Sequence, residues 1–208
     1  MNKLKYILAG AVVAFVAALS SCGNDMCKNK DAVVETIMSR RSIRKYKPQA
    51  VPRKVMTEIL DCGINAPNGQ NKQSWEIRVV DKPELLTAIK ATMAEAHPQL
   101  DSQMVAGCFR DAPVMVFIAR DTTYDFSAYD CGLLAQNMML SAWSMGVGSV
   151  CLGSPVRFIN TDNPVCTPIH DLLHFSEGYE LSLCVGFGYP DETPEAKPRD
   201  KGKYRFLD

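Results

Sequence analysis

The sequence lacks the residue spacings that mark several common binding sites. Its eight cysteines contain no Cys-x-x-Cys pair, so a zinc ribbon or a thioredoxin-like redox motif is not expected. No Gly-x-Gly-x-x-Gly run opens a helix, which argues against a Rossmann dinucleotide domain. Most of the cysteines lie in apolar runs and are predicted to be small core residues. In an exported protein some could form disulfides, and the sequence leaves their pairing open.

The sequence also lacks a metalloprotease-like zinc motif. His170 and His174 lie one helical turn apart, but Asp171 stands where such helices carry the general-base glutamate. The two imidazoles are therefore interpreted as surface or core residues, and no metal site is predicted.

Neither sign of charge is in excess in this chain. It contains 23 lysines and arginines and 23 aspartates and glutamates. Removal of residues 1–21 would take two lysines and no acid, leaving 21 basic residues against 23 acidic ones. Such a balance argues against a nucleic-acid partner. Hydrophobic residues make up 47% of the chain and charged residues 22%, which is typical of one globular domain.

The first residues of the chain have the pattern of a secretory signal. Lys3 and Lys5 precede an apolar run over residues 6–19, which is short for a membrane-spanning helix. Leu-Ser-Ser-Cys, ending at Cys22, resembles the bacterial lipoprotein box, which implies lipidation of Cys22 and export to the periplasmic or surface face of a bacterial membrane. An ordinary cleaved signal and an uncleaved anchor are the alternatives. The predicted organisation is a signal over 1–21, a tether over 22–30 and one domain over 31–208.

Helices and strands alternate along the predicted domain. Asp31 can cap a first helix, and Pro52 can open a second. Because the two kinds of element interleave, we expect an α/β (α+β) sandwich around one sheet. The other expected elements are strands at 75–80, 113–119, 147–152 and 181–186, and helices at 83–95, 127–145 and 168–174.

The expected helix over residues 127–145 is apolar nearly all round. Leu133, Met138 and Trp143 point in different directions around it. Such a helix is buried on more than one side. A single domain of this size rarely hides so much apolar surface, so a subunit interface is predicted.

Arginines are concentrated in one short stretch. Arg40, Arg41, Ser42 and Arg44 place three guanidinium groups and a hydroxyl within five residues. A guanidinium group matches phosphate bidentately, so the stretch suits a phosphate monoester. A basic run that stands alone is more often a solvated face.

Two further polar stretches accompany these arginines. Residues 68–75 read Asn-Gly-Gln-Asn-Lys-Gln-Ser-Trp, and their amide side chains can both donate and accept, as the edge of a heteroaromatic ring requires. Lys197 and Arg199 form a second cationic pair on a proline-rich tail. The combination favours a ligand with both a ring and an anionic group.

Together these segments resemble the nitroreductase family of flavin mononucleotide (FMN) enzymes. RRSIRKY resembles the family's opening Arg-x-Ser-x-Arg/Lys motif, and APNGQNKQSW resembles its Ala-Pro-Ser-x-x-Asn-x-Gln-Pro-Trp loop. DCGLLAQNMMLSAWSMGVGSVCLGS is similar to its central helix and the strand that follows, and GYPDETPEAKPR to its closing phosphate clamp. Asn68 and Ser74 depart from the pattern, which usually has Ser and Pro at these places.

The resemblance implies a fold, a cofactor and its ligands. The fold is a three-layer sandwich whose mixed, mainly antiparallel sheet carries helices on both faces, and the assembly is a homodimer with flavin sites at its interface. FMN carries the chemistry in such enzymes, so no catalytic side chain is named. Backbone N–H groups near the ring edge can stabilise reduced flavin. The implied cofactor-binding residues are Arg40, Arg41, Ser42, Arg44, Asn68, Asn71, Gln73, Leu152, Gly153, Lys197 and Arg199.

The implied activity is the reduction of an electron-poor small molecule, such as a nitroaromatic or a quinone, by ping-pong exchange with NAD(P)H. Because the predicted signal would export the protein, a membrane electron donor is an alternative to NAD(P)H. Reductive dehalogenation occurs in relatives and stays open. A flavin-binding lipoprotein without turnover is the alternative from another class.

Overall fold

A computed structural model describes residues 30–207, which fall into two units. The first unit ends at Arg40, and its described part is a helix over residues 30–39. The predicted signal, Cys22 and nearly all of the predicted tether lie outside the described residues. None of the helices in the described part combines the length and apolar character needed to cross a membrane.

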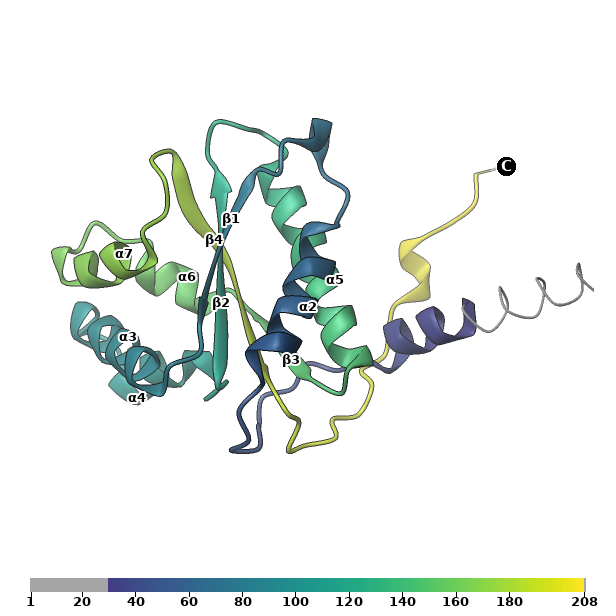
Figure 1. Cartoon of the computed structure of the whole chain (residues 1–208), viewed down its shortest axis with the longest axis horizontal. Helices are drawn as coiled ribbons and strands as arrows, with labels where there is room; N and C mark the ends of the chain where they lie inside the picture. Colours follow the sequence, from purple (N-terminus) through teal and green to yellow (C-terminus); the bar gives the residue numbers. More distant parts are fainter. Residues whose placement is uncertain (1–29, 208) are drawn as a thin grey trace, which may run out of the picture. The chain divides into compact units, whose positions relative to one another are not determined.

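The second unit is built around one four-stranded sheet with the strand order β1-β2-β4-β3 (Figure 1). All of its neighbouring strands pair antiparallel. A parallel bridge between Ser42 and Ser149 extends the sheet beyond β3, which gives it the mixed character that was predicted. The strands are β1 (Trp75–Val80), β2 (Val114–Asp121), β3 (Gly148–Leu152) and β4 (Tyr179–Gly188).

Helices cover both faces of this sheet, so the predicted three-layer α+β sandwich is confirmed (Figure 1). One face carries α2 (Arg53–Ile64) and α5 (Ser127–Ser144). The other face carries α3 (Pro83–Ala96), α4 (Ser102–Ala106), α6 (Ser154–Ile159) and α7 (Thr167–Leu173). Short 3-10 turns lie at Gly69–Asn71, Gly107–Phe109, Pro164–Cys166 and Lys201–Lys203.

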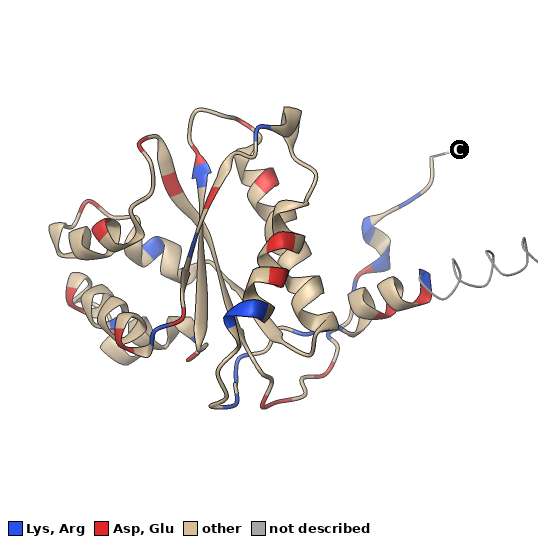
Figure 2. Ribbon diagram, in the orientation of Figure 1, with Lys and Arg blue, Asp and Glu red and all other residues tan. Residues whose placement is uncertain are grey.

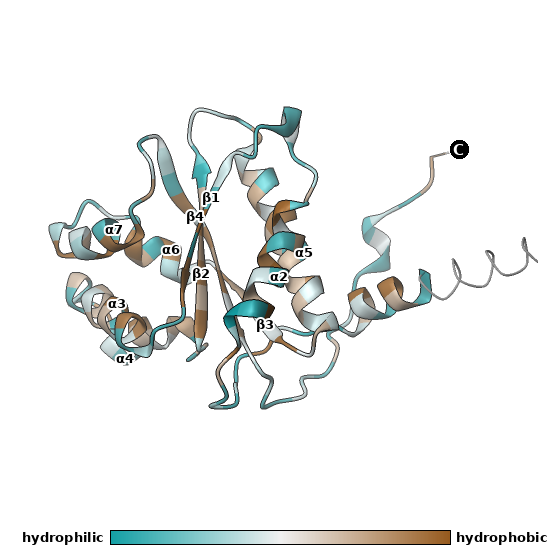
Figure 3. Ribbon diagram, viewed as in Figure 1, coloured by the Kyte–Doolittle hydropathy of each residue, from teal (hydrophilic) through white to brown (hydrophobic). Residues whose placement is uncertain are grey.

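The central strand β2 explains why the sheet needs two covering layers. Its apolar run is buried on both faces, and successive side chains alternate between two cores. Val116 and Ile118 pack in the core under α2 and α5, whereas Met115 and Phe117 pack in the opposite core. Figure 3 shows the same concentration of hydrophobic residues along the strands and the inner sides of the helices.

Helix α5 contacts both α2 and the sheet, so the predicted burial on more than one side is confirmed. Its exposed side nevertheless keeps Tyr129 and Leu133, which are 70% and 44% exposed. The two shortest helices, α4 and α6, were not predicted, and β4 is longer than the predicted strand at both ends.

Candidate functional site

The arginine segment, defined here as residues 41–47, is tied to the sheet on one side and to the returning C-terminal chain on the other. The Ile43 N–H donates to the Ser149 carbonyl at 3.0 Å, and the Lys47 N–H donates to the Tyr189 carbonyl at 2.9 Å. The Ile43 side chain is only 1% exposed and anchors the segment in the protein. The backbone of this segment is therefore ordered by pairing on both edges.

Glu192 holds the middle of the arginine segment. Its Oε1 accepts the N–H of Arg44 and, at 3.1 Å, the N–H of Lys45. The Asp191 N–H donates in return to the Lys45 carbonyl at 3.0 Å. Figure 2 shows basic and acidic positions on adjacent loops at one end of the sheet. The carboxylate engages the main chain, and the exposed Arg44 guanidinium donates to the Ser42 carbonyl at 3.1 Å.

Tyr46 adds a third support to the segment. Its hydroxyl donates to the Ile43 carbonyl at 2.7 Å, and its backbone bridges Pro190. Burial raises the pKa of Tyr46, and the nearby Glu192 carboxylate raises it further, against a smaller lowering by Arg44. The hydroxyl therefore stays protonated and acts as a structural donor.

Three other predicted phosphate ligands lie outside this segment. Arg40 belongs to the first unit, where its N–H donates to the Thr36 carbonyl at 3.1 Å. Lys197 and Arg199 lie on the exposed tail, where the Arg199 guanidinium donates to the Lys197 carbonyl at 3.2 Å. Within the described residues, no hydrogen bond joins Lys197 or Arg199 to the arginine segment.

The asparagine loop, defined here as residues 68–74, has an unusual backbone. Gln70, Asn71 and Gln73 have φ angles of 56°, 53° and 49°, in the left-handed region that non-glycine residues rarely adopt. The Asn68 Oδ1 accepts the Gln73 N–H at 2.9 Å and so closes the turn. Such conformations persist only where the surroundings hold them, and they concentrate at functional sites.

A buried carboxylate on α5 supplies that support. Asp130 is 2% exposed, and its Oδ1 accepts the Gly69 N–H at 3.0 Å. Its Oδ2 accepts the hydroxyl of Ser74 at 2.6 Å, and Ser74 is itself 1% exposed. A proline at position 74 could not donate this bond. Asn68 and Ser74, the two departures from the family pattern, thus each contribute a bond that shapes the loop.

The predicted ring-edge residues lie where β3 ends. The Leu152 side chain packs in the core, whereas Gly153 is exposed and caps the N-terminus of α6. A methyl group at Gly153 would meet no atom within 4 Å. The backbone at this strand end is therefore open to a ligand, while the Leu152 side chain is not.

The structure separates the predicted residues into two corners of one sheet. Trp75, next to the asparagine loop, pairs with Arg120 on β2, which in turn pairs with Glu180 on β4. Ser149, which bridges Ser42, pairs with Phe187 on β4. The two corners are therefore about 19 Å apart across the strands and about 23 Å apart along them. Figure 1 shows them at opposite ends of the sheet. One chain does not bring the two sets together.

The buried cysteines of the described part are not poised for chemistry. All six described cysteines are free, and four of them are buried, in agreement with the predicted core role for most cysteines. Burial raises the pKa of Cys108 and of Cys131 to about 12 and raises that of Cys184 as well. Such thiols are poor nucleophiles at neutral pH.

Sequence reasoning missed Asp130 and Glu192, the two carboxylates that hold the loops. A signal was present for each: Asp130 is an acid on the buried side of an apolar helix, and Glu192 directly follows the Gly-Tyr-Pro-Asp turn. His170 and His174, the two histidines one helical turn apart, lie on and just after α7. No group of three or more metal-ligating side chains occurs in residues 30–207.

Known proteins match this chain over most of its length. The 4-nitrobenzoate reductase of Pseudomonas putida is 28% identical, with 78% of this chain and 86% of that protein covered. A Methanothermobacter thermautotrophicus protein with the provisional name NADH dehydrogenase/NAD(P)H nitroreductase is 33% identical, with coverage of 80% and 81%. The crystal structure of an FMN-bound nitroreductase from Desulfitobacterium hafniense has a TM-score of 0.76 at 26% identity and covers 85% of this chain and 98% of its own.

The model of the nitroreductase family matches residues 37–189. This range contains the arginine segment, the asparagine loop and the end of β3, and it leaves Lys197 and Arg199 outside. The match spans well over half of the chain and agrees with the fold and with the relatives. The chain therefore belongs to the nitroreductase family.

Proposed function

We propose that this protein is an FMN-dependent oxidoreductase that reduces electron-poor small molecules such as nitroaromatics or quinones. The observation that carries the proposal is the arginine segment, whose backbone is fixed by Glu192 and β3 while the guanidinium group of Arg44 stays exposed. The relatives support it, because one is a 4-nitrobenzoate reductase and a structural neighbour holds FMN.

The basic corner fits the phosphate of FMN. Arg41, Ser42 and Arg44 offer guanidinium and hydroxyl donors from one ordered segment, and adjacent Arg40 would add another. Charge-assisted bonds from arginine to phosphate are among the strongest hydrogen bonds in proteins. Lys197 and Arg199 would close over the phosphate from the tail.

The asparagine corner and the end of β3 fit the ring and the ribityl chain. Asn71 and Gln73 present amides from the left-handed loop, with Asn68 as its brace, and Gly153 presents open backbone after Leu152. Bound FMN would supply the hydride and electron transfer. The chain would bind and orient it, and backbone N–H groups at the ring edge would stabilise the negative charge of the reduced ring.

A two-fold dimer is the assembly that we propose. The two ligand corners are too far apart in one chain to hold the same mononucleotide, and a second copy would bring an asparagine corner to each arginine corner. Exposed apolar side chains on the α2 and α5 face support a subunit contact at that place. These side chains are Ile64, Phe126, Tyr129 and Leu133.

A complementation experiment tests this arrangement. Arg44→Ala damages the arginine corner and Asn71→Ala damages the asparagine corner, so each variant alone should retain little FMN. In a mixed dimer one of the two sites would have both corners intact, and we expect about one FMN per dimer in the purified, doubly tagged species. A mixed dimer as poor in FMN as either parent would contradict a shared site.

Turnover is tested with the flavin spectrum of the purified, FMN-loaded protein. NAD(P)H should bleach it without oxygen, and a nitroaromatic should restore it. Because donor and acceptor would use the same face in turn, initial-rate plots should give parallel lines, and intersecting lines would contradict the ping-pong order. A protein that binds FMN but is neither reduced nor reoxidised would fit the flavin-binding lipoprotein instead.

Export and lipid anchoring at Cys22 are proposed on the sequence pattern alone. The lipid would hold the enzyme at the membrane, where a quinol or a redox protein could replace NAD(P)H as its donor. Palmitate labelling with a Cys22→Ala control tests the anchor, and reduction of bound FMN by nicotinamide-free reduced membranes tests the donor. Unlabelled protein in the cytosol would refute both proposals.

A further inference from the structure

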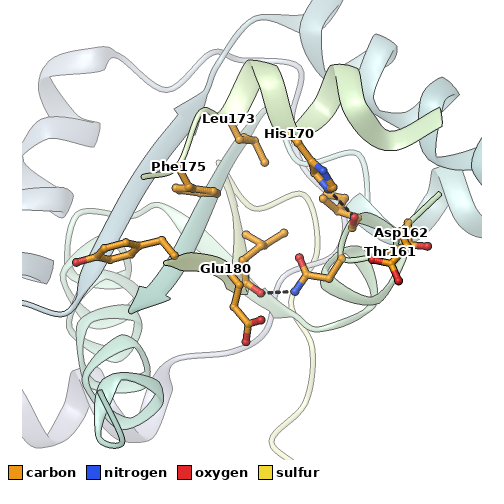
Figure 4. Close-up of a pocket in the computed structure, with 10 residues that line it drawn as sticks. Thr161, Asp162, His170, Leu173, Phe175 and Glu180 are labelled. Carbon is orange, nitrogen blue, oxygen red and sulfur yellow. Dashed lines mark hydrogen bonds between the residues drawn. The ribbon is translucent and has the colours of Figure 1, made fainter. Parts of the chain in front are cut away.

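A hollow of about 530 Å³ lies between α6, α7 and the start of β4 (Figure 4). Ile159, Leu173 and Leu181 form its apolar floor, and all three are nearly fully buried. Figure 4 shows Phe175 and Leu173 on one side of the opening and Thr161 and Asp162 on the other. A concave site of this size with an apolar floor is typical of small-molecule binding.

The hollow is separate from the proposed flavin site. None of its lining residues belongs to the arginine segment, the asparagine loop, the end of β3 or the tail. Helix α6 connects the two regions, because Gly153 precedes it and Ile159 ends it. The hollow is therefore a distinct place in the fold, and its role does not depend on the proposed activity.

The polar rim of the hollow is left with free acceptors. Asn160 uses Nδ2 to donate to the Leu181 carbonyl at 2.7 Å, which leaves its Oδ1 available. The Nε2 of His170 lies 2.8 Å from the Ile159 carbonyl, so in the neutral ring this nitrogen donates and Nδ1 accepts. A ligand that satisfies this rim has to bring hydrogen-bond donors.

The charges around the hollow leave one carboxylate unbalanced. Arg120 is paired with Glu180 at 2.8 Å through its Nε, and Arg78 is paired with Glu76 at 2.7 Å. Within residues 30–207, no hydrogen bond or ion pair engages the exposed Asp162 carboxylate. The hollow therefore combines an apolar floor, free acceptors and one uncompensated negative charge.

We propose that this hollow binds a small organic cation with an aromatic ring, an arylalkylamine in chemical class. The ring would lie on the apolar floor beside Phe175, and the ammonium group would donate to Asp162 and to the acceptors of the rim. A carboxylate ligand of the same size would be repelled by Asp162, and a neutral one would leave the charge unpaired.

Three probes of nearly equal shape test the proposal: benzylamine, benzyl alcohol and benzoate. Each is titrated into the flavin-loaded full chain, and amide shifts are followed by two-dimensional NMR. Benzylamine should give saturable shifts at residues 159–162, 173–175 and 179–181, with benzyl alcohol weaker and benzoate weakest. Equal affinity for all three probes, or shifts confined to the arginine segment and the asparagine loop, would overturn the proposal.

Two matched variants locate the charge. Asp162→Asn should weaken benzylamine binding by about three- to fivefold, the size expected for an exposed ion pair, and should leave benzyl alcohol unchanged. Asp171→Asn removes an exposed carboxylate from α7 that does not line the hollow, so it should leave all three affinities unchanged. Equal losses of benzylamine affinity in the two variants would show that general surface charge attracts the amine, and the specific site would be refuted.

Discussion

The arginine segment and the asparagine loop are ordered by different means. The segment is held by main-chain pairing to β3 and to the chain after β4, with Glu192 as an added support. The loop is held by side chains, because Asp130 and Asn68 satisfy a backbone that runs through left-handed residues. The comparison indicates that the segment tolerates the loss of a single side chain, whereas the loop depends on one buried carboxylate.

The largest effect is expected when two arginines that would bind the phosphate are removed, while Glu192 and Asp130 are kept. Arg44→Ala with Arg199→Ala should weaken FMN binding by about 4 kcal/mol, because two charge-assisted contacts to phosphate are lost. The measurement is the FMN dissociation constant by fluorescence quenching. Arg157→Ala with Arg205→Ala removes the same charge elsewhere and should have little effect. If the protein with Arg44→Ala and Arg199→Ala still purifies with stoichiometric FMN, the phosphate lies elsewhere.

Breaking the support of the asparagine loop should have the next largest effect. Asp130→Ala leaves the buried Ser74 hydroxyl and the Gly69 N–H without their acceptor, so the free energy of unfolding should fall by about 3 kcal/mol. Urea denaturation measures the loss, and Asp125→Ala, at an exposed carboxylate nearby, is the control. Unfolding midpoints that agree between the two variants would mean that the loop does not depend on Asp130.

The support of the arginine segment should matter less, and its charge can be separated from its bonds. Glu192→Gln keeps an oxygen that accepts the Arg44 and Lys45 N–H groups but removes a negative charge near the phosphate ligands. It should tighten FMN binding by about twofold. Glu192→Ala also frees the backbone and should bind FMN more weakly than the Gln variant. Indistinguishable affinities for the two variants would leave Glu192 without a positioning role.

An exposed pair outside both loops gives the smallest effect and serves as a reference. The hydrogen bond from Arg53, at 2.6 Å, lowers the pKa of Asp81 below its ordinary value. A carboxyl group whose pKa is lower in the folded than in the unfolded state stabilises the protein at pH values above its unfolded-state pKa. This stability is lost as the pH falls through the folded-state pKa. Asp81→Asn should lower Tm at pH 7 by about 1 °C or less, because solvent screens the pair. A Tm difference that persists at pH 2 would rule out this ion pair as its cause.

The sequence predicted the regular elements well where a pattern was long enough. The strand at Trp75–Val80 and the start of α5 agree with the structure because apolar runs and turn residues mark them clearly. Helices α4 and α6 have five and six residues, too few for a helical period to emerge. Local patterns therefore predicted the long helices and missed the two shortest ones.

The sequence suggested candidate residues for the site but did not predict how they are arranged. Asp130 reaches a residue 61 positions away, and Glu192 reaches one 148 positions away, so no local motif contains either contact. The separation of the two corners follows from the strand order, in which β1 and β3 lie at opposite edges. Sequence spacing alone does not determine which edges two motifs occupy.

The return of residues 189–192 to the arginine segment has a consequence for folding. The contacts of Lys47 with Tyr189 and of Arg44 with Glu192 close loops that span most of the domain, and such closures cost more chain entropy than local ones. Contacts of this kind form slowly in small domains. A growing chain that has not yet reached residue 189 can contain all four strands, yet its arginine segment can pair only with β3. The basic corner thus becomes complete only after residue 192 has been made, and cofactor uptake there would report that synthesis has passed that residue.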